Sequence, residues 1–567
     1  MPFGRHCMTT SRQDRSLIFA GERELPMTSV FSSMRAHLKR VFFLGLASLL
    51  GIAAGHGIAH AQKAGGTLRV QLMDTPPSAS PLEEITVSVV VPFMGVFNNL
   101  VIYDQAVARN SFDSIRPELA TGWQVSEDGK QVRFDLRREV KWHDGKPFTA
   151  ADVRCTFDLL MEKGEAKLRR NPRGVWYGNV EQVTSDNDFQ VTFHLKHPQP
   201  SLLALLSAGW SAIYPCHVAP AQMRRHPIGT GPFKFVEMKS NERVKLEKNN
   251  EYWRPGRPYL DGIEFIIISN RATRMLAFTA DRSDMTFPTD VTMPLYKDIM
   301  QQTPTAQCTV RPTGVTYNLI FNRDAAPFND ERARAALALT LDRKTLVDII
   351  SDGADVIGGA MLPPPAGVWG VGAEALADLP GYGPDVEASR EKGRALMREA
   401  GYGPDKRLKL KVTTRNIASY RDLSVLMIDQ LRHIYIDGEM ELLDSAVYFN
   451  RLYQKNYLLV VNATGSSLDD PDQHFVENYG CNSPRNFNGY CDPELTKLIA
   501  SQSLERDVEK RRSVVREIER KLARDIVRPI FSHNVTAACR QARVRDLTIM
   551  VNSNYNGWRF EDVWLDQ

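Results

Sequence analysis

The chain has 567 residues, of which 43% are apolar and 24% are charged, and its formal net charge is +4. This length is too great for one hydrophobic core, and the composition is that of a folded globular protein with two to four domains. Residues 1–61 hold seven Lys or Arg and three Asp or Glu, which accounts for the whole positive excess. Residues 62–567 are therefore neutral, and we expect no nucleic-acid partner.

The N-terminal stretch has the three regions of a secretory signal peptide. Basic residues at 35–40 precede an apolar run at 41–54, and Ala59-His60-Ala61 follows as a small-x-small cleavage site. The run is shorter than the roughly 20 residues that a membrane span needs. Cleavage after Ala61 would leave Gln62 as the new N-terminus. No Cys stands at this site to carry a lipid anchor, so we expect a protein that is free in the periplasm.

The next predicted elements are a strand at 67–72 and a helical stretch at about 93–100. A hairpin follows within 117–158. Val132, Phe134 and Leu136 alternate with charged residues, which is the period of a half-buried strand, and Asp128-Gly129 supplies the turn before it. After a second turn at Asp144-Gly145, Thr149 and Asp152 have the spacing of a capping box that opens a helix.

The wording of this segment is also distinctive. W-x-V-S-x-D-G at 123–129 and F-x-L-R-x-x-V-K-W-H-D-G-x-P-F-T-A-x-D-V at 134–153 closely resemble the signature of the extracytoplasmic solute-binding proteins of ABC transporters, in the peptide/nickel (family 5) class. The segment is scaffold, because its hairpin, turns and helix start determine fold rather than cargo. The resemblance continues over nearly the whole chain from Gly65 onwards.

The middle of the chain predicts a second hairpin at 181–195 and a short apolar helix or buried segment at 202–206. Pro227-Ile-Gly-Thr-Gly-Pro-Phe lacks the Lys-Ser/Thr of a phosphate-binding loop, and strand patterns follow it. We interpret this segment as structural. It leads to a buried strand at 264–268.

From Tyr317 the pattern is that of a new domain. A helix is predicted after Asn329 or Asp330 as its N-cap, and further helices are predicted at 385–400 and 423–434 around a strand at 409–413. The charged run 504–528 has apolar residues at helical spacing, and its charges are interpreted as a solvated face.

The resemblance implies an α/β, two-lobed periplasmic binding protein fold of type II, cluster C, with mixed sheets flanked by helices and an extra inserted domain. It implies the following segments: the N-terminal extension and signal peptide at 1–61; domain I at 62–100, 227–315 and 531–567; domain II at 101–226; and domain III at 316–530.

The same resemblance implies a function. The protein would capture a peptide or peptide-like solute between its lobes and deliver it to an inner-membrane ABC permease with its ATPase, acting as a monomer. Closure would be a population shift that the solute drives by bridging both lobes. A non-peptide solute such as an oligosaccharide or an opine is the alternative, and a secreted hydrolase is the alternative of another class.

The residues that select the solute break the family pattern. In peptide-binding members an aspartate shortly before an Asp-Pro motif pairs with the peptide's α-amino group. Counting back from Asp470-Pro471 puts Ser467 at that position. A buried ammonium without a carboxylate partner would cost about 3–5 kcal/mol. Either Asp469 or Asp470 takes over the role, or the solute has no free amine.

Candidate ligand-contacting residues follow from this region. Thr464, Ser466 and Ser467 would suit a hydroxyl-rich solute, whereas Asp469 and Asp470 are also placed to cap a helix that begins near Pro471. Tyr317, Asp74 and His533 complete the set of candidate ligand contacts.

Export to an oxidising compartment predicts disulfides. Cys481 and Cys491 close a nine-residue loop and are predicted to pair. Cys308 with Cys539 is a possible second bridge, and Cys155 is predicted to be buried and free.

Neither catalysis nor metal binding has a clear motif. The sequence contains no G-x-S-x-G, H-E-x-x-H or P-loop, so we predict no catalytic residues and no cofactor. The histidines are scattered; His143 with Asp144, and His217 with His226, are interpreted as turn or surface residues rather than metal ligands.

Overall fold

The computed structural model describes residues 62–566, and the predicted signal peptide lies outside the described residues. The first sheet has the order β1-β10-β9-β8, with β1 (Thr67–Leu72) parallel to β10 (Gly262–Ile267). Strands β9 (Arg243–Lys248) and β8 (Phe233–Lys239) continue it in antiparallel fashion. Two distant segments of the chain thus meet in one sheet, and this confirms the predicted strand at 67–72.

The second sheet is antiparallel and consists of the two predicted hairpins. Its order is β4-β5-β7-β6, with bounds Ala120–Val125, Gln131–Leu136, Gln190–Leu195 and Val180–Asn187. Helix α3 (Ala150–Leu160) packs on β6 and β7, and it begins with the predicted capping box, in which the Thr149 amide donates to the Asp152 carboxylate at 3.0 Å. Val153, Phe157 and Leu160 are buried as expected.

The third sheet is mixed, with the order β13-β12-β14-β11-β15. Strands β12 (Leu408–Arg415), β13 (Ile436–Leu443) and β14 (Leu459–Gly465) are parallel. The crossovers between them are helices α11 (Ala418–Arg432) and α12 (Ser445–Tyr453). Strands β11 (Gln307–Phe321) and β15 (Ile530–Arg540) complete the sheet antiparallel to their neighbours.

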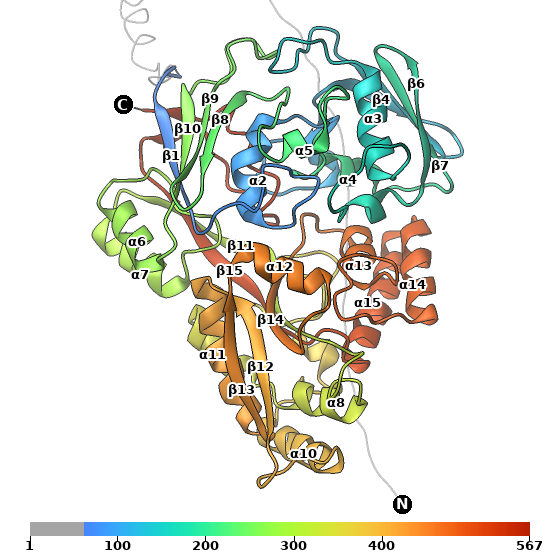
Figure 1. The fold of residues 1–567 in the computed structure, drawn as a ribbon, viewed down its shortest axis with the longest axis vertical. Helices are drawn as coiled ribbons and strands as arrows, with labels where there is room; N and C mark the ends of the chain where they lie inside the picture. The colour runs from blue at the N-terminus through green and yellow to red at the C-terminus, as the bar shows by residue number, and fades with distance from the viewer. Residues whose placement is uncertain (1–61, 567) are drawn as a thin grey trace, which may run out of the picture. The chain divides into compact units, whose positions relative to one another are not determined.

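The remaining elements cover these sheets or connect them (Figure 1). The helices are α2 (Val87–Phe93), α4 (Leu202–Ser207), α5 (Pro220–Met223), α6 (Arg271–Thr279), α7 (Met293–Gln302), α8 (Glu331–Leu339), α9 (Arg343–Ser351), α10 (Val386–Glu399), α11 (Ala418–Arg432), α12 (Ser445–Tyr453), α13 (Pro471–Tyr479), α14 (Pro493–Leu504) and α15 (Val508–Arg524). The short strands are β2 (Val101–Tyr103), β3 (Ile115–Pro117), β16 (Val544–Arg545) and β17 (Trp564–Leu565).

Strands β11 and β15 join two lobes. We call residues 62–306 and 541–566 the first lobe, residues 322–529 the second lobe, and β11 with β15 the hinge strands. At one end the hinge strands adjoin the first lobe through bridges from Met285 and Val291 to β15, and at the other end β11 pairs with β14. The pairing of β11 with β15 shifts register between Pro312 and Thr316, and Gly314 there has φ +70°.

Some details of the structure differ from the sequence-based expectations. The helix expected at about 93–100 is instead α2 followed by a short 3₁₀ turn at Met94–Val96. Residue 316, the expected start of domain III, lies within β11, whose residues pair with β15 on both sides of the register shift. Helix α15 has the predicted solvated face, but Glu519 on it is buried and accepts from the Met361 amide at 2.6 Å.

Three disulfides form among residues 62–566. Cys481–Cys491 confirms the predicted pair, and Cys308–Cys539 joins the two hinge strands at a point where they pair directly. The prediction that Cys155 is free was wrong, because it bonds Cys216. Residues 152 and 216 are held together by the Asp152 carboxylate, which accepts from the Cys216 amide at 2.9 Å, so the fold brings the two sulfurs within reach.

The structure confirms that the Gly-Thr-Gly segment at 229–231 has a structural role. A Cβ at Gly229 would lie 1.8 Å from the carbonyl oxygen of Val96, so the backbones approach too closely for any side chain. The Gly229 amide also donates to Nδ1 of His143 at 3.2 Å, and the His143 amide donates to the Gly229 carbonyl at 2.9 Å. His143 is therefore part of the scaffold.

Replacing Gly229 is expected to destabilise the protein. Gly229→Ala should lower the free energy of unfolding by about 3 kcal/mol, because the added methyl forces apart two backbone segments. Chemical denaturation measures this loss. Gly122→Ala is the matched control, since a Cβ at Gly122 meets nothing within 4 Å. Equal stability of the two variants would contradict the close approach.

Candidate functional site

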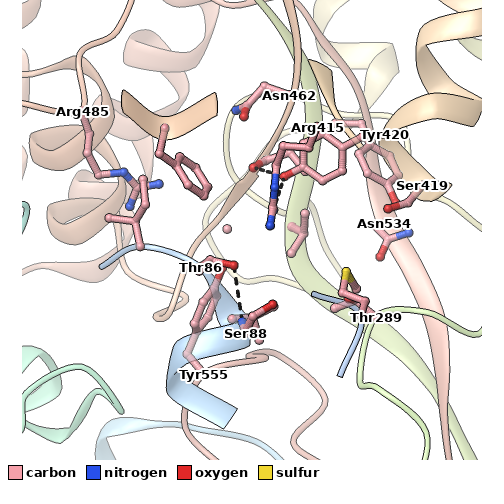
Figure 2. Close-up of a pocket in the computed structure, with 18 of the residues that line it drawn as sticks. Thr86, Ser88, Thr289, Arg415, Ser419, Tyr420, Asn462, Arg485, Asn534 and Tyr555 are labelled. Atoms are coloured by element: carbon pink, nitrogen blue, oxygen red, sulfur yellow. Dashed lines mark hydrogen bonds between the residues drawn. The ribbon is translucent and has the colours of Figure 1, made fainter. Parts of the chain in front are cut away.

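A cavity lies at the junction of the two lobes and contains about 700 Å³ of empty space, including the part open to solvent. From the first lobe, Thr86, Ser88, Thr289 and Tyr555 contribute to its lining (Figure 2). Thr86 is the N-cap of α2 and accepts from the Ser88 amide at 3.4 Å. The start of α2 thus presents hydroxyl groups to the cavity.

The second lobe contributes the ends of strands and the start of a helix. Arg415 is the last residue of β12, and Ser419 and Tyr420 lie in the first turn of α11, which begins three residues later. Asn462 comes from β14, and Arg485 comes from the loop after α13. Ligands commonly bind at the carboxyl ends of parallel strands and between domains, and this cavity has both properties.

A buried ion pair between the lobes borders the cavity. The Asp74 carboxylate, in the loop after β1, accepts from Nη2 of Arg415 at 2.7 Å, and their side chains are 15% and 6% exposed. Ser445 and Ser88 also donate to this carboxylate. The guanidinium of Arg415 lies over the rings of Tyr420 and Phe449, at 5.0 and 5.1 Å from their centroids.

A second buried ion pair also crosses between the lobes. Glu477 of α13 lies 3.6 Å from Nη1 of Arg173 in the first lobe, and it accepts from Nε1 of Trp176 at 3.2 Å. Arg485, which lines the cavity, donates to the same carboxylate. Burial lowers the pKa of Arg173 to about 10, although the charge of Glu477 opposes this shift.

Of the predicted contacts, Tyr317 lines the cavity. Asp74 lies outside the lining and accepts a hydrogen bond from the lining residue Arg415. The structure places Thr464 beside the cavity, in an internal network: its hydroxyl oxygen accepts from Asn318 at 3.0 Å and from Asn462 at 2.9 Å. The Ser466 hydroxyl donates to the Leu468 carbonyl at 2.6 Å and lies outside the lining.

Ser467 lies at the contact between the lobes rather than in the cavity lining. Its side chain is buried, and its hydroxyl oxygen has no hydrogen-bond partner among the described residues. Its carbonyl accepts from Ser553 at 3.0 Å and from Asn556 at 2.8 Å, both in the first lobe. Its backbone thus ties the two lobes together.

The remaining candidates have structural partners. Asp470 is the N-cap of α13 and pairs with Arg511 at 2.9 Å, which is the capping role that the sequence allowed. Asp469 accepts from the Val368 amide at 3.0 Å, while its other carboxylate oxygen is buried without a partner. His533 on β15 bonds the Gly359 carbonyl at 3.0 Å, and burial lowers its pKa to about 4.

Several lining residues were missed by the sequence analysis, namely Arg415, Tyr420, Asn462, Arg485 and Tyr555. They come from four separate segments that only the fold brings together. The one usable signal was positional, since Arg415 lies between the predicted strand at 409–413 and the predicted helix at 423–434.

Within residues 62–566 no group of three or more His, Cys, Asp or Glu side chains is arranged to hold a metal ion. In the same range no helix has both the length and the apolar character to cross a bilayer. The site consists of a cavity lined by arginine, aromatic, hydroxyl and amide groups, which suits binding of a polar molecule.

Two lobes, two hinge strands and a cavity between the lobes define a hinged binding protein. A family model described as bacterial extracellular solute-binding proteins, family 5 middle, matches residues 114–486, which is more than half of the chain. The chain therefore belongs to family 5 of the bacterial extracellular solute-binding proteins.

Curated relatives share about a quarter of their aligned residues with this chain. Di/tripeptide-binding protein 2 of Pseudomonas aeruginosa (strain UCBPP-PA14) is 25% identical over 436 residues, covering 72% of this chain and 79% of the relative. The peptide transport periplasmic protein SapA of Salmonella typhimurium (strain LT2) is 26% identical over 425 residues, covering 69% of this chain and 74% of the relative.

Solved structures share the fold. The periplasmic binding protein DppA from Helicobacter pylori, in complex with peptide STSA, has a TM-score of 0.78 at 21% identity, covering 89% of this chain and 99% of DppA. AgaA from A. tumefaciens R10, in complex with agropinic acid, has a TM-score of 0.73 at 21% identity, covering 88% of this chain and 99% of AgaA. The predicted two-lobed α/β fold is confirmed.

Asp469 gives the protein a specific pH dependence. Burial raises its pKa to about 7, whereas an unfolded Asp titrates near about 3.9. Between about pH 4 and 7 the folded protein holds a proton that the unfolded chain has released, so stability should fall as the pH rises through this range.

Asp469→Asn should make this fall shallower, as measured by chemical denaturation at a series of pH values from 5 to 8. A residual slope is expected from Glu519, whose pKa burial raises to about 8. The exposed carboxyl of Asp405 provides the control, since Asp405→Asn should keep the slope of the parent protein. An unchanged slope in Asp469→Asn would show that this carboxyl is ionised in the folded state.

Proposed function

We propose that this protein captures a peptide or peptide-like solute in the cavity between its lobes, as the substrate-binding component of an ABC importer. The observation that carries the proposal is the cavity itself, which draws its lining from both lobes and from the hinge strands. A solute that contacts both lobes stabilises the closed arrangement by the contacts that exist only there. Such differential contact is the physical basis of capture.

The relatives support a peptide-like solute. The names of the curated relatives cited above refer to di/tripeptides and peptide transport, and the DppA structure contains a peptide. In this chain, Tyr317 and Asn462 of neighbouring strands line the cavity with groups that suit the amide bonds of a peptide. We propose Tyr317 as a direct contact and Asp74 as the residue that holds Arg415 in position.

A hydroxyl-rich solute is the second candidate. AgaA, with a similar fold, is described with agropinic acid rather than a peptide. Thr86, Ser88, Thr289 and Ser419 line the cavity with hydroxyl groups that both donate and accept, as a sugar-like solute requires.

The proposed function also includes export of the protein to the periplasm and delivery of the solute to a permease. Residues 1–61 would direct the chain to the periplasm and be removed after Ala61. The loaded protein would dock as a monomer on an inner-membrane permease that works with an ATPase. With the segments proposed for the domains, the lining residues of the cavity would belong to domains I and III, and none of them to domain II.

Blocking the cavity should abolish capture. Ser419→Trp places a large side chain in the cavity and should weaken binding at least about tenfold. The measurement is the rise in melting temperature with a panel of di- and tripeptides, N-blocked peptides, oligosaccharides and opines, followed by titration calorimetry of the best ligand.

Ser389→Trp is the matched control. Ser389 also lies in the first turn of a second-lobe helix and is also half-buried, but it is outside the cavity lining. It should bind as the parent protein does. A panel in which no member stabilises the parent protein, or equal binding by both variants, would refute the proposed capture. Turnover of a panel member would favour the hydrolase alternative.

A further inference from the structure

The charged side chains that line the cavity are all positive. Arg415 and Arg485 line it, and none of the described residues in the lining carries a carboxylate. The bordering carboxylate of Asp74 is already engaged by Arg415, Ser445 and Ser88. A positively charged group of a solute would therefore find hydroxyl, amide and carbonyl oxygens, but no free anionic partner.

Positive charge also exceeds negative charge just behind the lining. Arg173, Arg485 and Arg528 are each at most 7% exposed. In the described part of the chain the first two share the single carboxylate of Glu477, and Arg528 has no ion pair. Instead Arg528 donates to Asn478 at 3.2 Å and weakly to the Arg485 carbonyl at 3.4 Å.

These arginines retain unused donors. Nε of Arg485, Nε of Arg528, and Nε and Nη1 of Arg173 are buried without a hydrogen-bond partner in the described residues. Arg485 is the member of this group that reaches the cavity, where Figure 2 shows it among the lining side chains. Buried guanidinium groups with free donors are costly unless an anion satisfies them.

We propose, on the basis of the proposed function, that the solute carries a carboxylate or phosphate group that binds at Arg485, and that it has no free ammonium group. The acid group supplies the negative charge that the cluster of Arg173, Arg485 and Arg528 lacks, and it offers oxygens to a fork of N–H donors. A free ammonium would be buried without a counter-charge. Ser467, at the position where the family pattern has an aspartate, supplies none.

The test separates the two ends of a small peptide. Dialanine is compared with N-acetyl-dialanine, dialanine amide and N-acetyl-dialanine amide by titration calorimetry at constant pH and ionic strength. N-acetyl-dialanine, which has the acid and no amine, should bind at least about tenfold more tightly than dialanine or either amide. Tighter binding of dialanine or of dialanine amide would overturn the proposal.

Simple anions test the same site without assuming a peptide. Inorganic phosphate and succinate should each raise the melting temperature of the parent protein above that in sodium chloride of equal ionic strength. The larger of the two effects identifies the acid group. If these anions stabilise the protein but no peptide derivative binds, the anion site stands and the peptide-like solute is refuted. If neither anion stabilises the protein, the anion site is refuted whatever the peptides do.

Variants of Arg485 test whether this side chain is responsible for the stabilisation by phosphate and succinate. Arg485→Gln should lose the stabilisation by both anions, and Arg485→Lys, which keeps the charge and the pairing with Glu477, should retain part of it. Arg543→Gln is the matched control, because Arg543 pairs with Asp281 and Asp284 in the first lobe, away from the cavity lining. Full stabilisation of Arg485→Gln by both anions would place the anion elsewhere.

Discussion

The contact between the two lobes depends on two buried ion pairs. Asp74 pairs with Arg415 at 2.7 Å on one side of the cavity, and Glu477 approaches Arg173 to 3.6 Å on another. Removing one member of a buried pair leaves an uncompensated charge and costs about 3–5 kcal/mol. The lobes are therefore held by contacts that exist only when they meet, and each contact lies next to a residue that lines the cavity.

The hinge strands are where we expect the two lobes to move relative to each other. β11 and β15 belong to both lobes, and the shift in their register around Gly314 interrupts regular pairing where the lobes join. The Cys308–Cys539 disulfide fixes the strands to each other on the side of the first lobe. Motion is thus expected to concentrate between this disulfide and Thr316, because a few residues at the ends of elements absorb most hinge rotation.

The sequence predicted local structure well and the site poorly, for a physical reason. The hairpins at 120–136 and 180–195, the capping box at Thr149 and the helix cap at Asp470 depend on neighbours in sequence, so pattern and turn chemistry sufficed. Arg415, Arg485 and Tyr555 come together only through tertiary packing. Likewise, the Cys155–Cys216 bond depends on how α3 packs against a distant loop.

We expect the buried cross-lobe charges to stabilise the arrangement in which the two lobes meet around the cavity. Small-angle X-ray scattering of Asp74→Asn, compared with Asp422→Asn, tests it most directly. Asp422 also crosses between the lobes, to Arg271 at 2.8 Å, but its side chain is 56% exposed. Exposed pairs contribute little. Asp74→Asn alone should have a larger radius of gyration than the parent protein; an unchanged radius for Asp74→Asn, or an equal increase in both variants, would contradict this expectation.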